Sequence, residues 1–417
     1  MKTLLLCFCL CYPFIGFAQQ EEILIKVHSN DYEFINVPVS IPLKSLPVAV
    51  WNDQVLYEKE DQTFRTIPHQ IESGSNPQLT FMMDGVMGRQ SVKEFVLRAG
   101  KKEPVFPSFE ISADEETFIM ILEDQKILSY QFREKMPPEG VDPVFRRSAF
   151  IHPIWSPSQT VLSRIQPEDH YHHYGIWNPW TKTKYRGEEI DFWNLGEKQG
   201  TVRFKGLISR VEGPVYGEMN ILQDHIKLMD GTMEETVLHE KWSIRAWKLG
   251  KKDKFWLIDF TSILNCAEDS PLELTAYRYG GGIGFRAAEY WTSENTSVLT
   301  SEGRTREEAD GSRAKWCMVS AGNENSLNEP GILFLSHSLN HEHPEPMRVW
   351  PSDANEGRGD LFFEFCPIRH NDWILEPGKE YALNYRLLVF DNPISADEAE
   401  LYWKSFVNSP EVEIIKE

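Results

Sequence analysis

HEKWSIRAW (residues 239–247) and FWLIDFTSIL (residues 255–264) are the two stretches that decide the fold class. Both combine branched and aromatic residues with polar residues, a pattern typical of β-strands that bury one face. Further stretches of this character are ILIKVHS (23–29), FINVPVSIPL (34–43), PVAVW (47–51), ETFIMIL (116–122), TVRFKGLIS (201–209), GILFLSHS (331–338) and YALNYRLLVF (381–390). Pro, Gly, Asn and Asp separate these stretches, which predicts an all-β sandwich fold rather than alternating βα units.

One α-helix is predicted near the C-terminal end of the sequence, at SADEAELYWKSFV (residues 395–407). Ser395 and Glu398 have the spacing of a capping box, in which the two side chains satisfy the first free amide groups of a helix. Leu401 and Phe406 follow on a helical period. We expect this helix to cover a sheet.

The length of the chain predicts about two domains, because 417 residues exceed what one hydrophobic core usually organises. Pro- and Gly-containing segments interrupt the strand pattern around residues 101–107 and at KMPPEGVDP (135–143). We predict a small N-terminal β-sandwich at residues 20–112. A large β-sandwich at residues 113–417 then holds everything of chemical interest.

The first stretch, MKTLLLCFCLCYPFIGFAQQ, has the layout of a cleaved secretory signal: a lysine, an apolar run and a small-residue exit. We assign residues 1–19 to this signal and expect a periplasmic or secreted protein. The run is too short to span a membrane, and no later stretch approaches twenty apolar residues. Cys7, Cys9 and Cys11 lie inside the run, so no lipid anchor is expected.

The remaining cysteines are Cys266, Cys317 and Cys366. They are far apart, odd in number and contain no CxxC pair. Neither a disulfide framework nor a cysteine zinc site is therefore indicated. We expect three buried thiols that behave as small hydrophobic groups.

Nucleic acids and nucleotide cofactors are not expected. The chain carries 63 acidic and 43 basic residues, a net charge of −20, whereas phosphate binding needs a basic face. YGGGIGFRA (279–287) superficially matches a dinucleotide-binding turn, but strand-like sequence lies on both sides and no helix follows. We predict that its glycines let another backbone or a ligand approach a strand closely.

DHYHHYGIWNPW (169–180) is the densest chemical motif of the sequence. If its first residues are extended, His170 and His172 share one face, and Asp169 and His173 share the other. Two imidazoles on one face suit either a divalent metal or an acid/base pair near neutral pH. The alternative is a hydrogen-bonded structural corner.

Other histidines are candidate partners of this cluster. His152 is a further candidate metal ligand, and His337, at a predicted strand end in SHSLNHEHPEP (336–346), is the preferred partner. DANEGRGD (353–360) resembles a calcium loop only slightly, because Arg358 occupies the place where that loop needs glycine. We expect no site there.

Two arginines are candidate ligand anchors. Arg164 lies just upstream of the histidines and Arg286 lies in the glycine-rich motif. A guanidinium can hold a carboxylate, a phosphate or sugar hydroxyls with two hydrogen bonds. The alternative is a structural ion pair with one of the many acids.

Carboxylates and tryptophans near the histidines in the sequence indicate a sugar ligand. In EEIDFWNLG (188–196), Glu189 and Asp191 share one face of a strand, an arrangement that allows the paired-carboxylate chemistry of glycosidases. Four tryptophans interleave with polar groups here, as in clefts where sugar rings stack on indoles: Trp155, Trp177, Trp180 and Trp193.

Several motifs together resemble a secreted bacterial family of unknown function labelled "methane oxygenase PmoA": IHPIWSPSQTVLSRIQPEDHYHHYGIW (151–177), YGGGIGFR (279–286), RAKWC (313–317) and SHSLNHEHP (336–344). The resemblance covers about residue 125 to the end. It implies a large β-sandwich found among polysaccharide-utilisation proteins, and it places the family's His-rich segment at Asp169, His170, His172 and His173. Methane oxidation is not implied, because that enzyme is an integral membrane protein. Tyr174 stands where relatives commonly have arginine, which implies a different ligand preference.

The resemblance and the residues together predict an exported carbohydrate-active enzyme, a hydrolase, lyase or epimerase that acts on oligosaccharides. By analogy of fold, the large domain is similar to the galactose-mutarotase supersandwich. Candidate catalytic residues are Asp169, His170, His172 and Asp191, candidate substrate-binding residues are Arg164, Trp177, Arg286 and His337, and candidate metal ligands are His152, His170 and His172. The alternatives are a non-catalytic glycan-binding protein and a metal-dependent oxidative enzyme.

Overall fold

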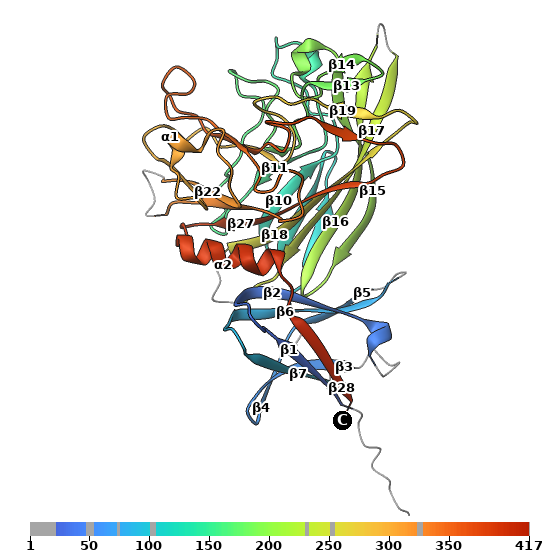
Figure 1. Cartoon of the computed structure of the whole chain (residues 1–417), viewed down its shortest axis with the longest axis vertical. Helices are drawn as coiled ribbons and strands as arrows, with labels where there is room; N and C mark the ends of the chain where they lie inside the picture. The colour runs from blue at the N-terminus through green and yellow to red at the C-terminus, as the bar shows by residue number, and fades with distance from the viewer. Residues whose placement is uncertain are drawn as a thin grey trace, which may run out of the picture.

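The computed structural model describes residues 22–46, 54–72, 76–100, 106–229, 233–250, 255–322 and 328–416. In these residues the protein is built from antiparallel sheets, so the predicted all-β class is confirmed (Figure 1). The predicted strand at 47–51 and the predicted signal at 1–19 lie outside the described residues. The signal stays a prediction.

The smaller of two sandwiches contains the N-terminal strands (Figure 1, lower half). Its five-stranded sheet has the order β28 (Glu411–Lys416), β1 (Ile23–His28), β7 (Val92–Ala99), β3 (Gln54–Glu60) and β4 (Thr63–Thr66). Its three-stranded sheet has the order β2 (Phe34–Pro42), β6 (Gln78–Met87) and β5 (His69–Glu72). The C-terminal strand β28 pairs with β1 from Ile23 opposite Lys416 to His28 opposite Glu411. The C-terminal end of the chain therefore completes the N-terminal sandwich.

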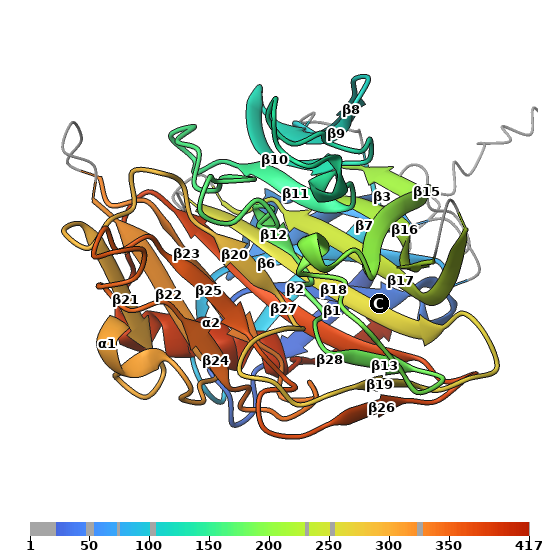
Figure 2. The same cartoon turned by 90° about the horizontal axis from the view of Figure 1, so that it is seen from above.

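The larger sandwich consists mainly of two eight-stranded sheets (Figure 2). The first has the order β15 (Gly200–Glu212), β16 (Tyr216–Leu228), β17 (Glu234–Trp247), β18 (Phe255–Cys266), β27 (Tyr381–Phe390), β23 (Gly331–Ser336), β22 (Trp316–Ala321) and β21 (Thr296–Thr300). The second has the order β24 (Met347–Val349), β25 (Phe362–Phe365), β20 (Gly284–Arg286), β12 (Ile176–Trp177), β11 (Phe150–Ile154), β10 (Gln125–Gln131), β9 (Thr117–Leu122) and β8 (Phe109–Ala113). A four-stranded sheet has the order β14 (Glu188–Ile190), β13 (Thr183–Tyr185), β19 (Leu272–Leu274) and β26 (Trp373–Leu375). The division at residues 112 and 113 stays a prediction, and it falls inside β8.

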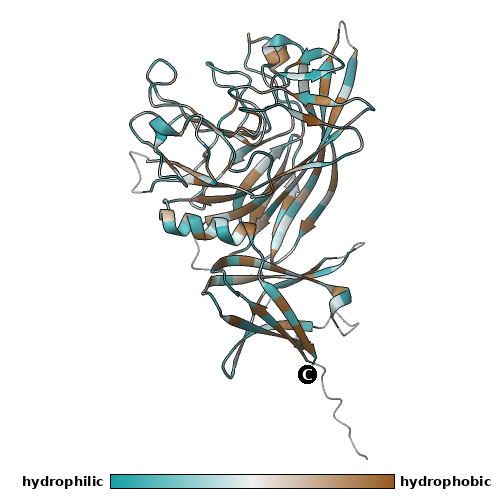
Figure 3. Ribbon diagram, in the orientation of Figure 1, coloured by the Kyte–Doolittle hydropathy of each residue, from teal (hydrophilic) through white to brown (hydrophobic). Residues whose placement is uncertain are grey.

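The two eight-stranded sheets face each other across one large apolar core. Ile244 and Phe260, which are directly opposite each other on β17 and β18, share this core with Ile151 and Phe285 of the second sheet. Apolar and polar residues alternate along the long strands (Figure 3). The two stretches that decided the predicted fold class are thus central strands with one face in the core.

A polar cluster inside this core anchors the segment that follows β12. Glu240 on β17 is fully buried and accepts hydrogen bonds from Asn178, from Ser262 at 2.5 Å and from the indole of Trp242 at 2.6 Å. His225 contacts the second carboxylate oxygen of Glu240 at 2.8 Å. Through the hydrogen bond from Asn178 to Glu240, the end of the histidine motif is fixed to the opposite sheet.

The predicted helix is present as α2 (Ala396–Val407), and the amide of Glu398 donates to the Ser395 hydroxyl at 3.2 Å, as the capping box requires. The helix lies where the two sandwiches meet (Figure 1). Asn36 donates to the hydroxyl of Tyr402 at 2.8 Å, and the amide of Ile35 donates to Ser405 at 2.9 Å. A second helix, α1 (Arg306–Ala309), was not predicted.

No helix within the described ranges is long and apolar enough to cross a membrane. Three 3-10 turns complete the regular structure of these ranges: η1 (Leu43–Ser45), η2 (Pro143–Phe145) and η3 (Leu195–Glu197). Cys266, Cys317 and Cys366 are buried and free, as predicted.

Glu345 gives the larger sandwich a pH-dependent stability. It is fully buried and accepts hydrogen bonds from Asn340 at 2.8 Å, Tyr385 at 2.9 Å and Ser336 at 3.1 Å. Burial outweighs these donors and raises the pKa of Glu345 from 4.5 to about 7. The folded state therefore holds a proton that the unfolded chain releases above pH 4.5, so stability falls as the pH rises through this interval.

Glu345→Gln is expected to remove this dependence and to raise the free energy of unfolding at pH 8, relative to wild type, by about 3 kcal/mol. The measurement is urea denaturation at pH 5 and pH 8. Glu110→Gln, at an exposed position, serves as the control and should follow the wild type at both pH values. A Glu345→Gln variant with an unchanged pH dependence would show that Glu345 is ionised in the folded protein.

Candidate functional site

The first part of the histidine motif is a loop of tight turns, so the extended conformation considered for residues 169–173 does not occur. The amide of His170 donates to the carbonyl of Pro167 at 2.9 Å, and the amide of His173 donates to the carbonyl of His170 at 3.0 Å. These amides bond within the loop instead of joining a strand ladder. Gly175, at φ +56°, ends the loop where a Cβ atom would lie 2.2 Å from the carbonyl oxygen of Ile151.

The turns bring all three imidazoles together. The ring centroids of His170 and His173 are 4.7 Å apart, those of His172 and His173 are 5.0 Å apart, and those of His170 and His172 are 5.4 Å apart. One nitrogen from each ring lies within 4.8 Å of the others, close enough for all three to bind one metal ion. His173, which a strand would turn to the other face, thus belongs to the cluster.

Burial and positive neighbours favour the neutral form of two of these rings, His172 and His173. Burial, followed by the charges of His170 and Arg286, lowers the pKa of His172 to about 3. Burial also lowers the pKa of His173 well below its usual value, and His172 and Arg286 act in the same direction. Neutral imidazole is the form that binds a metal or accepts a proton.

Asp169 fixes the orientation of His170. Its Oδ2 lies 2.6 Å from Nδ1 of His170, and a carboxylate can only accept, so Nδ1 is the donor and Nε2 is the nitrogen that faces away from Asp169. Arg286 donates to the same oxygen at 2.8 Å. Burial alone raises the pKa of Asp169, but the His170 hydrogen bond and the Arg286 charge outweigh it and hold that pKa below its usual range.

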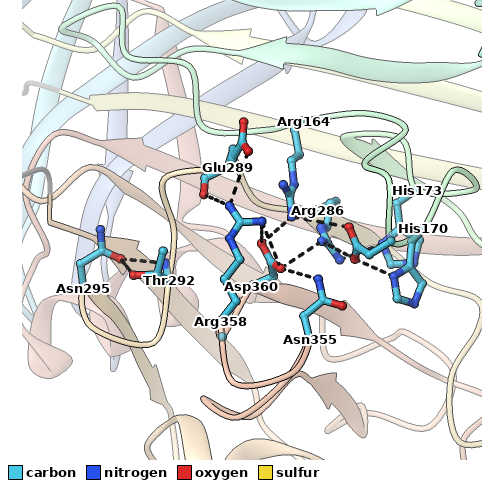
Figure 4. Close-up of polar contacts among 12 residues, drawn as sticks. Arg164, His170, His173, Arg286, Glu289, Thr292, Asn295, Asn355, Arg358 and Asp360 are labelled. Atoms are coloured by element: carbon cyan, nitrogen blue, oxygen red, sulfur yellow. Dashed lines mark hydrogen bonds and ion pairs between the residues drawn. The ribbon is translucent and has the colours of Figure 1, made fainter. Parts of the chain in front are cut away.

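Asp360 connects Arg286 to two further arginines (Figure 4). It is 1% exposed, binds Arg164, and lies 3.1 Å from Arg358 and 3.8 Å from Arg286. Arg286 also donates weakly to Nδ1 of His173, at 3.4 Å. A buried network of arginines and aspartates thus supports the histidines from behind.

A cavity of about 390 Å³ opens above the histidines, within the size range of small-molecule sites. Trp193, Tyr279, Trp350 and Phe362 supply aromatic walls, and the remaining lining residues are His170, His172, His173, Asn194, Arg278, Arg348, Pro351, Ala354 and Asn355. The ring of His170 lies 4.8 Å from that of Trp350. The cavity combines aromatic faces, two amides, two guanidiniums and three imidazoles.

Three predicted binding or catalytic residues lie behind this cavity. Trp177 is fully buried against His173, with ring centroids 5.3 Å apart, so a sugar cannot stack on it. Arg286 is fully buried and neutralised by acids, so it supports the histidines rather than a ligand. Asp191 is buried and accepts from the amides of Trp193 at 2.9 Å and Asn194 at 2.7 Å, which positions the cavity wall.

The remaining candidates lie apart from the cavity wall. Arg164 is committed to Asp360. His152 contacts Ser163 at 2.9 Å and is not one of the three clustered histidines. His337 packs against Phe406 of α2 at 5.0 Å, so the predicted partnership with the cluster is wrong. The reason is that β23, which precedes His337, lies in the first eight-stranded sheet, whereas the histidine loop borders the second.

The segment DANEGRGD, where no site was expected, contributes to this one. Asn355 lines the cavity and donates to Asp360 (Figure 4). Gly357 and Gly359 have φ angles of +87° and +74°, so the chain reverses and carries Asp360 into the interior. The glycines were a visible signal of a tight loop, but nothing in the sequence marked its last aspartate as buried.

The glycine-rich motif behaves as predicted. At Gly282, with φ +60°, a Cβ atom would lie 2.0 Å from the carbonyl oxygen of Phe365, so only glycine permits this approach of two backbones. The amide of Gly280 donates to both carboxylate oxygens of Glu364, at 3.0 and 3.1 Å. These contacts hold Tyr279 in the cavity wall.

The fold and the site define an all-β protein with a three-histidine cavity at the edge of a large sandwich. Residues 120–404 match a family of unknown function, DUF6807, and the chain belongs to this family. The matched region includes every residue that lines the cavity and leaves out most of the N-terminal sandwich. It gives the methane oxygenase label no support. No curated protein matches the chain.

Proposed function

We propose that the protein is an exported carbohydrate-active enzyme, a hydrolase, lyase or epimerase, that uses a divalent metal to act on an oligosaccharide. The ligands are His170, His172 and His173. The observation that carries the proposal is the convergence of three imidazoles in the wall of an aromatic-lined cavity. Export rests on the pattern of residues 1–20.

The donor set fits a catalytic metal. Three protein ligands leave a coordination position for water or substrate, and imidazole suits zinc, copper, iron and nickel. Asp169 behind His170 is the carboxylate–histidine pairing that orients metal ligands. A bound divalent ion would polarise a sugar oxygen or lower the pKa of a bound water.

The rest of the cavity fits a sugar. Trp193, Tyr279 and Trp350 offer ring faces and edges to the apolar side of a pyranose. Asn194 and Asn355 provide amides for hydroxyl groups. None of the described lining residues is an aspartate or a glutamate, so a paired-carboxylate glycosidase mechanism is not supported, and a bound metal would supply the acid/base chemistry by activating water.

The test is a panel of oligosaccharides incubated with purified protein, first after treatment with a chelator and then with zinc, manganese, copper or iron restored. We expect one class of oligosaccharide to be cleaved or epimerised only with metal present. Saturable binding without turnover would instead show a glycan-binding protein. Oxidised sugar products with copper or iron would show an oxidative enzyme, and turnover that survives chelation would show metal-free acid/base chemistry.

A further inference from the structure

The charge of the cavity wall is opposite to that of the protein. The chain has a net charge of −20, yet the described residues that line the cavity include Arg278 and Arg348 and no aspartate or glutamate. A wall drawn at random from this chain would contain more acids than bases. Because positive charge is in local excess, we expect the ligand of this cavity to carry negative charge.

Arg278 has a free guanidinium at the cavity. Its carbonyl accepts a hydrogen bond from Arg369 at 2.6 Å, so its backbone is held in place. Its guanidinium lies 5.5 Å from the ring centroid of Tyr279. Among the described residues, no carboxylate forms an ion pair with it. The side chain is therefore available to an anion that enters the cavity.

Arg348 is only partly neutralised. It contacts Asp310 at 2.7 Å, but Asp310 also pairs with Arg369 at 3.3 Å, so two guanidiniums share one carboxylate. Glu364 lies opposite Arg348 on the neighbouring strand. Burial raises the pKa of Glu364 well above its usual value, which disfavours a negative charge at this position.

The two arginines belong to neighbouring segments. Arg369 bridges them, because its Nη1 contacts the carbonyl of Arg278 at 2.6 Å and that of Met347 at 3.1 Å. Arg286 differs from both, because it is fully buried and already compensated by Asp169. An anion in the cavity can thus reach Arg278 and Arg348 but not Arg286.

We propose that the substrate is an anionic sugar whose carboxylate or sulfate group is bound by Arg278 and Arg348. This inference rests on the proposed function and adds the class of substrate. Guanidinium forks bind both kinds of anion with paired hydrogen bonds. The aromatic walls pack against the sugar ring.

The test measures binding by calorimetry on the metal-loaded protein. The probes are oligogalacturonates, the same oligomers with their carboxyl groups reduced to alcohols, and sulfated galactan oligomers beside desulfated ones. We expect one anionic series to bind at least about 10-fold more tightly than its neutral counterpart, with the preference shrinking as salt rises. Which series binds identifies carboxylate or sulfate as the anion.

Arg278→Gln should weaken binding of the preferred anionic oligomer by about 10-fold or more and leave neutral oligomers within about 2-fold. Arg278→Lys should retain part of the preference, and Arg348→Gln should have a smaller effect because Asp310 already shares its charge. Arg304→Gln, at an exposed position outside the cavity, is the control and should bind as wild type.

Equal binding of charged and neutral oligomers, or turnover of neutral ones alone, would overturn this inference and leave the proposed function in place. If the protein binds and alters no sugar of either kind, both proposals are overturned. The inference would also be overturned if Arg278→Gln and Arg348→Gln both kept the full preference for the anionic oligomer over the neutral one.

Discussion

Replacing His170 and His172 with alanine is expected to abolish metal binding: bound metal should fall from near one ion per chain to less than about a tenth of that. Two of three converging ligands are lost, and the remaining His173 offers a single nitrogen. Turnover of the oligosaccharide found in the panel should fall by about 10²- to 10⁴-fold, because the acid/base function depends on the same groups. Elemental analysis and a product assay check the two effects separately.

Tyr171→Phe is the matched control for this pair. Tyr171 lies between the two histidines, and its ring packs against Phe145 at 5.7 Å. Its replacement keeps the loop and its packing but changes no imidazole, so metal content and turnover should remain at wild-type levels. Equal metal in the double variant and the wild type would contradict the metal centre. If the wild type holds no metal and the double variant nevertheless loses turnover, the histidines act in acid/base catalysis.

The fold was predictable where the strands are long. HEKWSIRAW and FWLIDFTSIL form most of β17 and β18. A long stretch of alternating apolar and polar residues buries all its apolar side chains on one face only as a β-strand. The helix was predictable from Ser395 and Glu398, since capping is a local interaction. Pairings between distant segments were not predictable. β28 is six residues long, and nothing in EVEIIK says that its partner is β1 at the other end of the chain.

The residue types of the site could be predicted from the sequence, but their arrangement in space could not. The density of histidines identified the right segment, whereas the strand argument assigned His173 to the wrong face because turns replace the strand. Arg286 was expected to anchor a ligand, but the structure buries it against Asp169 and beside His173, where it supports the histidines. The partners Trp350 and Asp360 come from almost two hundred residues later in the chain, and their approach depends on how the second sheet is ordered.

Asp360→Ala is expected to lower the free energy of unfolding by about 3–5 kcal/mol, since it removes the acid from a buried ion-pair network. Arg164 would lose its direct carboxylate partner, and Arg286 would retain only Asp169. The Arg286 side chain is fully buried and that of Arg164 is only 15% exposed, so water can replace the lost carboxylate only in part. Urea denaturation at pH 7 measures the loss, and metal affinity should fall as well because Arg286 and Asp169 orient His170.

Asp353→Ala in the same loop is the control, because Asp353 is exposed and its replacement should change stability by less than about 0.5 kcal/mol. The double variant Arg164→Met/Asp360→Leu separates the loss of attraction from the burial of an uncompensated charge. It should recover part of the stability that Asp360→Ala loses, because the guanidinium disappears together with the carboxylate. A double variant less stable than Asp360→Ala would mean that Arg164 finds another acid and that the network tolerates the loss of Asp360. In that case His170 would keep its orientation through Asp169 alone, and the metal affinity of Asp360→Ala would equal that of the wild type.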